Sequence, residues 1–251
     1  MILTVDIGNT TIALGIVDKG KVVNVERIDT GINARQIEMA LRNCIRLFIK
    51  KGYLLKVAII SSVVPKLTSK VNNLIYKYGN MQSRVVGKDI IVPIKNLYKN
   101  PKQVGQDRLV GAYAAFHLYG KPVIVIDLGT AITFDVVSKQ GEYLGGVIVP
   151  GLRLSAESLF LKTALLPKIT IKAPKAIIGK TTEESILSGL FYGYGSLCQG
   201  FIERISRHLR ANPKVIMTGG HTHLMKKFIS PNVRIIDEDL VHKGMALLAV
   251  L

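Results

Sequence analysis

The chain has 251 residues, 48% of them hydrophobic, and a formal net charge of +17. This length suits one large or two small domains with an ample core, and no apolar run approaches the roughly 18 residues of a membrane span. Nucleic-acid binding is not favoured despite the charge, because lysines and arginines are scattered in ones and twos and a basic surface also attracts anionic metabolites.

The first half of the chain is predicted to form a sheet with two helices. Residues 18–21 form a turn between two β-like runs, and apolar residues recur at helical spacing in two later segments. Proline 65 suits the first turn of the second helix. The expected elements are strands Ile2–Val5, Thr11–Val17 and Val22–Ile28, a helix Asn33–Lys51, a strand Val57–Ser61, a helix from Pro65 and a strand Arg84–Val86.

The second half repeats this order after a connecting helix, Gln106–Tyr119. A repeated order of elements indicates that the two halves have similar folds. The expected elements are strands Val123–Ile126, Ala131–Val137 and Tyr143–Val149, a helix from about Thr182 to Arg210, a strand Val215–Met217, a helix near His223–Ile229, a strand Val233–Ile236 and a helix over the last dozen residues.

One short motif occurs in both halves, each time after an apolar run. It reads Asp6-Ile7-Gly8-Asn9-Thr10 at the start and Asp127-Leu128-Gly129-Thr130-Ala131 almost half the chain later. A duplicated strand–Asp-x-Gly-Thr–strand unit implies two like-folded halves that face one another. We expect the acids and glycines to meet in a cleft suited to a phosphate-bearing ligand and its metal.

The first copy of the motif has the groups needed to hold phosphate. Gly8 allows a tight turn and a close approach to a ligand, and backbone N–H groups can bind phosphate oxygens without a helix. Asn9, Thr10 and Thr11 add side-chain donors, and Asp6 would face Mg²⁺ or its waters. The alternative is a plain hairpin with Asp and Asn as turn formers.

The second copy offers an acid and two hydroxyls. Asp127 could hold another cation, and Thr130 or Thr133 could reach a phosphate. The alternative is a buried aspartate that neighbouring backbone N–H groups satisfy.

A third group of residues, Gly105-Gln106-Asp107-Arg108, precedes an apolar helix. Asp107 could accept a proton from a substrate hydroxyl while Arg108 binds an anionic group. Asp107 would also lie in the first turn of the helix, where the helix dipole favours a negative charge, so a capping role remains an alternative.

Three other features carry less weight. Gly179-Lys180-Thr181 resembles the end of a P-loop, but position 174 is Pro where that motif needs Gly. His221 and His223 have no third ligand candidate nearby, which does not favour zinc. Cys44 and Cys198 fit no metal or redox spacing, and no signal peptide is expected, which indicates core packing in a reduced cytoplasm.

Together these motifs resemble those of the type III pantothenate kinase family, in the superfamily of acetate and sugar kinases, Hsp70 and actin. The Asp-x-Gly-Thr repeat marks only the superfamily, whereas Gly-x-Asp-Arg with Gly-Gly-x-x-x-Pro-Gly is more specific. His221 departs from the family, which often has an acidic or small residue there. The matching stretches, which span essentially the whole chain, are Asp6–Thr10, Tyr98 with Asn100-Pro101, Gly105–Arg108, Asp127–Thr133, Gly145-Gly146, Pro150-Gly151, Ile178–Thr182 and Thr218–Gly220.

The resemblance implies an α/β fold of two tandem ribonuclease H-like (actin-like ATPase) domains, each a mixed sheet flanked by helices. Residues 1–104 would form the half with the ATP phosphate loop. Residues 105–251 would form the half with the cation site, the substrate pocket and the interface of a homodimer.

The resemblance also implies an activity, in which ATP phosphorylates the terminal hydroxyl of pantothenate to 4'-phosphopantothenate, the first step of coenzyme A biosynthesis. Asp107 would accept the proton, Mg²⁺ would accompany the nucleotide near Asp6, and Asp127 would hold a monovalent cation, K⁺ or NH₄⁺. The implied ATP residues are Asp6, Ile7, Gly8, Asn9, Thr10, Thr11, Ile12, Ala13 and Thr130, and the implied pantothenate residues are Tyr98, Gly105, Gln106, Asp107, Arg108 and Thr182.

Three other functions are less favoured by the sequence. A kinase for another hydroxylated acid or sugar is less favoured because Arg108 suits a carboxylate-bearing substrate. An actin- or Hsp70-like switch needs added subdomains that 251 residues barely allow. A non-catalytic regulatory factor would have no need of the full set of Asp6, Asp107 and Asp127.

Overall fold

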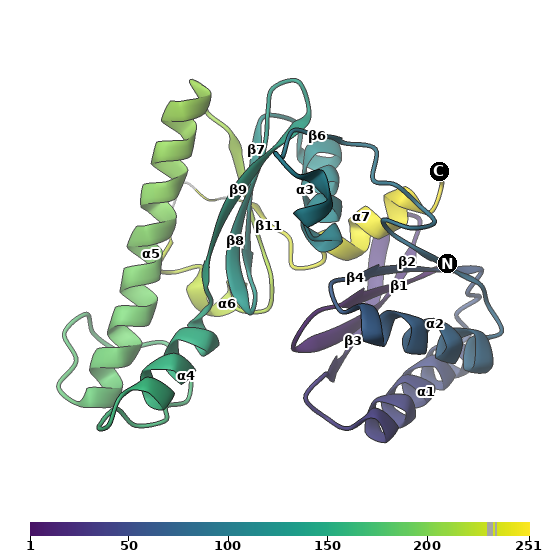
Figure 1. The fold of residues 1–251 in the computed structure, drawn as a ribbon, viewed down its shortest axis with the longest axis horizontal. Coiled ribbons are helices and arrows are strands. Elements are labelled where there is room, and N and C mark those ends of the chain that lie inside the picture. Colours follow the sequence, from purple (N-terminus) through teal and green to yellow (C-terminus); the bar gives the residue numbers. More distant parts are fainter. Residues whose placement is uncertain (230–232, 234) are drawn as a thin grey trace. The chain divides into compact units, whose positions relative to one another are not determined.

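A computed structural model describes residues 1–229, 233 and 235–251, which form two compact units (Figure 1). The first unit contains Met1–Leu118 and Asp239–Leu251, and the second contains Tyr119–Glu238. These units differ from the expected division into 1–104 and 105–251. The expected connecting helix belongs almost entirely to the first unit, and the C-terminal segment returns to that unit.

The first unit is built on a mixed sheet in the order β3-β2-β1-β4-β5. β1 pairs antiparallel with β2 and parallel with β4, which places the carboxyl ends of β1 and β4 at one edge. The strands are β1 (Ile2–Ile7), β2 (Thr11–Asp18), β3 (Lys21–Asp29), β4 (Val57–Ser62) and β5 (Ser83–Val85); β6 (Lys95–Asn96) and the short 3₁₀ helix η1 (Pro101–Gln103) follow them along the chain.

Two helices, α1 (Ala34–Lys50) and α2 (Pro65–Gly79), cover one face of this sheet (Figure 1). Alternate residues of β1, β2 and β4 share a buried apolar cluster with both helices. Asn33 begins α1 with a capping box, because its side chain accepts from the backbone of Gln36 while Gln36 accepts from the backbone of Asn33. The expected start of this helix is therefore confirmed to within one residue.

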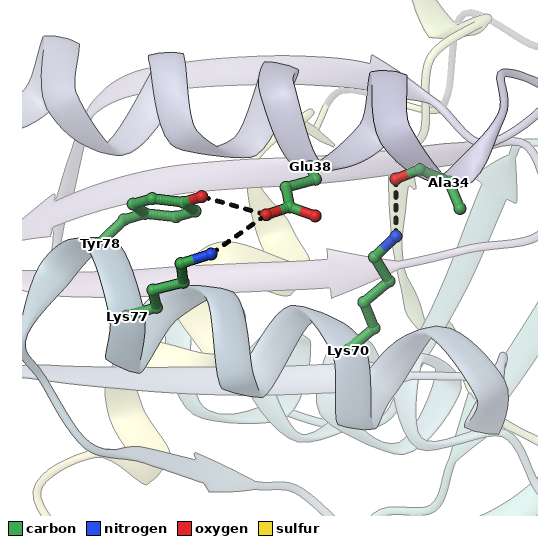
Figure 2. A network of polar contacts seen from close by, with 5 residues as sticks. All are labelled: Ala34, Glu38, Lys70, Lys77 and Tyr78. Carbon is green, nitrogen blue, oxygen red and sulfur yellow. Dashed lines mark hydrogen bonds and ion pairs between the residues drawn. The ribbon is translucent and has the colours of Figure 1, made fainter.

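Polar contacts also link α1 to α2 on their outer side (Figure 2). The Glu38 carboxylate accepts a hydrogen bond from Tyr78 Oη at 3.0 Å and pairs with Lys77 Nζ at 3.4 Å. Lys70 Nζ donates to the Ala34 carbonyl at 2.6 Å. The Tyr78 hydrogen bond and the two lysines hold the pKa of Glu38 below its usual value.

The opposite face of the first sheet is covered by α7 (Leu240–Leu248), the last helix of the chain. His242 of α7 is buried, and its Nδ1 lies 2.9 Å from Thr4 Oγ1 of β1. Gly15 of β2 permits this contact, since a Cβ there would lie 2.6 Å from the same nitrogen. α3 (Gln106–Tyr119) meets α7 through Gly244, where a Cβ would lie 2.7 Å from Val110.

The second unit repeats the mixed sheet, in which the strands that belong to this unit follow the order β11-β10-β7-β8-β9. β7 again pairs antiparallel with the next strand and parallel with a later one, as β1 does in the first unit. This repetition confirms the expected doubling. The strands are β7 (Val123–Leu128), β8 (Ala131–Val137), β9 (Glu142–Pro150), β10 (Lys214–Thr218) and β11 (Ile235–Ile236).

The helices of the second unit share one apolar cluster with β7, β8 and β10. They are α4 (Leu152–Lys162), α5 (Thr182–Leu209) and α6 (Thr222–Met225). α4 was not expected from the sequence. The helix near 223–229 is shorter than expected, and Arg234 of the expected strand Val233–Ile236 lies outside the described residues.

Both cysteines are free thiols. Cys198 is fully buried in the second cluster, and burial raises its pKa to about 12. Cys44 packs against the first cluster and is partly buried, which also raises its pKa. Core packing was the expected role. Among the described residues, no helix is long and apolar enough to cross a membrane.

Candidate functional site

The first Asp-x-Gly turn follows β1 directly and is held by its own backbone. Gly8 N–H donates to Thr11 O at 2.9 Å and closes the turn. Thr30, just beyond β3, supports it from outside: its N–H donates to Thr10 O at 3.0 Å and its hydroxyl to Asn9 O at 2.6 Å. The side chains of Asn9 and Thr10 remain exposed. The turn therefore has a fixed backbone and presents polar side chains to a ligand.

The second turn, after β7, is held in the same way. Gly129 N–H donates to Ala131 O at 3.1 Å, and Gly151, just beyond β9, donates to Thr130 O at 3.0 Å. In both units a residue that follows the third strand supports the turn between the first two. Thr130 is exposed, as Asn9 and Thr10 are. The duplication thus includes both the motif and the hydrogen bonds that hold each turn.

The Asp127 carboxylate lies against two glycines of the second unit. A Cβ on Gly129 would lie 3.4 Å from Asp127 Oδ1, and a Cβ on Gly219 would collide with the same oxygen. Gly219 also has a φ of +93°, which side chains other than glycine rarely adopt. β10 pairs Thr218 with Asp127, so the turn that follows β10 is placed beside the carboxylate.

The segment Gly105–Arg108 lies at the start of α3, in the first unit. Asp107 Oδ1 accepts a hydrogen bond from Arg108 N–H at 2.9 Å. Burial raises the pKa of Asp107 above its usual value, an effect that outweighs this hydrogen bond and the Arg108 charge. The pKa is therefore raised at a position where the helix dipole alone would favour the charged form of the carboxylate.

Glycines fix this segment against the sheet of the first unit. A Cβ on Gly105 would collide with Asp107 Oδ1 and lie 3.4 Å from Val63, which follows β4. Gly87, after β5, has a φ of +83°, and a Cβ there would lie 2.7 Å from the Gln106 side chain. The segment therefore packs beside the carboxyl ends of β4 and β5. Asp6 lies at the same edge of the sheet, near the carboxyl end of β1.

The remaining predicted residues are divided between the two units. Tyr98 follows β6 in the first unit, where its N–H donates to Asn96 Oδ1 at 2.9 Å. Thr182 begins α5 in the second unit, together with Asp127 and Thr130. Thr133 Oγ1 donates to the buried Asp135 carboxylate at 3.2 Å.

The Gly179-Lys180-Thr181 segment has a local structural role. Thr181 caps α5 by accepting from Glu184 N–H at 3.2 Å, and Lys180 N–H donates to the Glu184 carboxylate at 2.8 Å. The segment is thus a helix start with a reciprocal cap.

His221 lies beside the second turn. Its N–H donates to Leu128 O at 3.0 Å, and burial, aided by the positive charge of Arg153, lowers its pKa. His221 and His223 belong to no group of three His, Cys, Asp or Glu side chains that could hold a metal, among the described residues.

Ser61 was not singled out from the sequence, although it lies at the same edge as Asp6. It ends the apolar run of β4 and is paired in register with Asp6. The signal that could have drawn attention to it is the Ser61-Ser62 pair directly after four apolar residues, Val57–Ile60.

Comparison with solved structures defines the class of fold. The chain aligns with the ethanolamine utilization protein EutJ from Carboxydothermus hydrogenoformans at a TM-score of 0.56, with 16% identity and coverage of 98% and 89% of the two chains. It aligns with a ROK family glucokinase from Streptomyces griseus at a TM-score of 0.53, with 14% identity and 98% coverage of both. The fold is the doubled ribonuclease H-like fold of the actin-like ATPases, as expected.

Sequence comparison defines the family. Residues 2–204 match the model of the type III pantothenate kinase family. The chain is 46% identical over 230 residues to a type III pantothenate kinase of Persephonella marina, covering 90% of each chain. It is 40% identical over 250 residues to one of Citrifermentans bemidjiense, covering 99% of this chain and 98% of that one. The chain belongs to the type III pantothenate kinase family.

Proposed function

We propose that this protein transfers the γ-phosphoryl group of ATP to the terminal hydroxyl of pantothenate. The product, 4'-phosphopantothenate, would start coenzyme A biosynthesis. Family membership supports this activity, and so does one structural observation. The partly buried Asp107, with its raised pKa, is held by glycine packing at the sheet edge that carries Asp6.

ATP would bind through the two turns. The first, from Asp6 to Ala13, offers backbone N–H groups and exposed Asn9 and Thr10 side chains to phosphate oxygens, and Thr130 adds a hydroxyl from the second unit. When bound, Mg²⁺ neutralises the charge that develops on the transferring phosphate. The residues near Asp6 fit that ion, because a carboxylate lies in register with the fully buried hydroxyl of Ser61, for which no partner exists among the described residues.

The acceptor would be held by Tyr98, Thr182 and the segment Gly105–Arg108. Arg108 suits the pantothenate carboxylate, since its guanidinium can bind a carboxylate in a bidentate manner. Asp107 would take the hydroxyl proton while the hydroxyl oxygen bonds to the γ-phosphorus and the bond to the β–γ bridging oxygen breaks, which releases ADP. In phosphoryl transfer this base chiefly orients and relieves the attacking hydroxyl.

Asp127 would bind a monovalent cation, K⁺ or NH₄⁺. Gly129 and Gly219 both lie close to its Oδ1, and a side chain at position 219 would collide with this oxygen. A cation there would lie near the second turn and offset phosphate charge at Thr130.

A homodimer formed through the second unit is part of the proposal. α4 and the segment after it expose large apolar side chains, including Leu161 at 64% and Leu165 at 91%. Such side chains usually mark an interface when they cluster. Leu161→Glu is expected to shift the mass measured by light scattering from dimer to monomer, and a wild-type protein that is monomeric would contradict this part.

The decisive experiment is a measurement of ADP release from Mg-ATP, with and without pantothenate, in K⁺ and then in Na⁺. We expect turnover that requires pantothenate and either K⁺ or NH₄⁺. Turnover without regard to pantothenate would overturn the substrate assignment. Equal rates in K⁺ and Na⁺ would overturn only the cation assignment.

A further inference from the structure

Ser61, the penultimate residue of β4, has a buried hydroxyl that the fold does not use. Its exposed fraction is 0%, and Oγ has no hydrogen-bond partner among the residues that the structure describes. A hydroxyl removed from water without a partner destabilises the fold, so buried polar atoms are nearly always satisfied. An unsatisfied hydroxyl at the edge of a functional sheet is consistent with a contact to a ligand.

The face on which Ser61 lies follows from strand alternation. Ile60 and Ala58 belong to the cluster under α1 and α2, so Ser62 shares their face and Ser61 lies on the other one. Ser62 is also satisfied by protein: its hydroxyl accepts from Val64 N–H at 3.0 Å and from Thr68 Oγ1 at 2.7 Å. The two adjacent serines thus differ in face and in hydrogen bonding.

On its own face Ser61 is next to Asp6. The parallel register pairs Asp6 with Ser61, and Thr4, two residues earlier in β1, faces His242 on the α7 side. Partners in register on neighbouring strands lie about 4.8 Å apart and point to the same side. Ser61 and Asp6 are therefore neighbours on this face, close to the carboxyl edge of the sheet.

The segment Gly105–Arg108, which carries Asp107, packs near the end of β4. Val63 lies two residues beyond Ser61, and its N–H continues the ladder by donating to Ile7 O at 3.1 Å. A Cβ on Gly105 would lie 3.4 Å from Val63. Ser61 therefore lies along β4 between Asp6, on the adjacent strand, and the segment that carries Asp107.

We propose that Ser61 is a positioning residue for the nucleotide's Mg²⁺, with its hydroxyl accepting a hydrogen bond from a metal-bound water that Asp6 also holds. A hydroxyl beside a carboxylate, both able to accept, favours a ligand that donates hydrogen bonds. A phosphate oxygen at the same place would be repelled by the Asp6 carboxylate, whereas a water polarised by Mg²⁺ is a strong donor. This inference rests on the proposed kinase function.

The test measures binding of the non-hydrolysable analogue AMPPNP by titration calorimetry, with and without Mg²⁺ and without pantothenate. For Ser61→Ala we expect Mg-AMPPNP to bind about tenfold more weakly, a loss typical of one hydrogen bond to a charged or polarised group. Binding of AMPPNP without Mg²⁺ should be unchanged. Ser62→Ala is the matched control, and both affinities should match the wild type.

Thermal unfolding of the free protein separates this role from a structural one. Ser61→Ala should unfold at the same or a higher temperature than the wild type, because it removes an unsatisfied buried hydroxyl. Ser62→Ala should unfold at a lower temperature, because it removes two hydrogen bonds at the start of α2.

Two outcomes would overturn the inference: unchanged Mg-AMPPNP binding in Ser61→Ala, or an equal loss of binding with and without Mg²⁺. Neither depends on the acceptor. If the wild type binds Mg-AMPPNP but shows no pantothenate-dependent turnover, the substrate assignment fails while the inference about Ser61 stands.

Discussion

Tyr119 Oη donates a hydrogen bond to Asp237 Oδ2 at 2.6 Å, although the two residues are 118 positions apart in the chain. Both belong to the second unit, and each lies beside a point where the chain passes between units, at 118–119 and at 238–239. The contact therefore links the two ends of the chain segment that forms the second unit. Burial, followed by the Asp237 carboxylate, raises the pKa of Tyr119.

Tyr119→Phe should reduce the free energy of unfolding by about 1–2 kcal/mol, the usual effect of removing a hydrogen bond to a buried carboxylate. Asp237 is 5% exposed, so water compensates poorly. Denaturant unfolding would measure the change. Tyr76→Phe, at a side chain that is 65% exposed, is the control and should change stability by much less. Equal effects of the two substitutions would show that the Tyr119 contact contributes nothing specific.

His242 should make the first unit sensitive to acid. Burial, assisted by the positive charge of Arg27, lowers its pKa to about 4, below the value of about 6.5 expected in the unfolded chain. The unfolded state therefore binds a proton between those pH values while the folded state does not, and stability falls as the pH drops from 6.5 to 4. The effect of this one group amounts to roughly 3 kcal/mol.

The measurement is urea unfolding at pH 7 and at pH 4.5, compared between the wild type and His242→Asn. The asparagine keeps a nitrogen near Thr4 but does not titrate, so its stability should fall less between the two pH values. Parallel losses in both proteins would assign the acid sensitivity to other groups.

Asp107→Asn should lower pantothenate-dependent turnover by about 100-fold or more, the scale of general-base contributions, while the unfolding midpoint stays close to that of the wild type. As the pH is lowered, the wild-type rate should begin to fall at a higher pH than it would with a solvent-exposed aspartate. The reason is that burial raises the pKa of Asp107 and the base must be ionised. Glu38→Gln, on the outer side of α1, is the control for loss of a carboxylate (Figure 2). Full activity of Asp107→Asn would refute the assignment of the base.

Gly219→Ala should abolish the response to K⁺. The new methyl group would collide with Asp127 Oδ1, and the backbone φ of +93° is strained for any residue with a Cβ. We expect a loss of about 1–3 kcal/mol in stability as well. Gly220→Ala is the matched control, since nothing lies within 4 Å of its Cβ position. Rates with K⁺ and Na⁺ are compared for both variants; a Gly219→Ala enzyme with normal K⁺ stimulation would contradict the placement of the cation.

Much of the fold could be predicted because its signals are local. The turns at Gly8 and Gly129 follow apolar runs that end in Asp, and Asn33 with Gln36 carries the capping box of α1. Helix α4 could not be predicted in the same way. Its apolar side chains lie on several sides, and Leu154 and Phe160 are among those left exposed, so no single buried face gives a periodic pattern.

The local sequence pattern also could not predict which sheet the last helix, α7, covers. The apolar face of α7 fits either sheet by composition, and its packing on β1 and β2, where His242 meets Thr4 and Gly15, shows that it covers the first one. Ser61 illustrates the same limit at the site. A serine near the end of a strand is ordinary in sequence, and its pairing with Asp6 becomes visible only through the strand register.

The return of α7 has a consequence for how the protein is made. The second unit, residues 119–238, is synthesised as one uninterrupted stretch. The first unit is complete only after residues 239–251 have been synthesised. Until then the sheet face with Thr4 and Gly15 lacks the helix that buries it. The unit that is synthesised first therefore also contains the residues that are synthesised last.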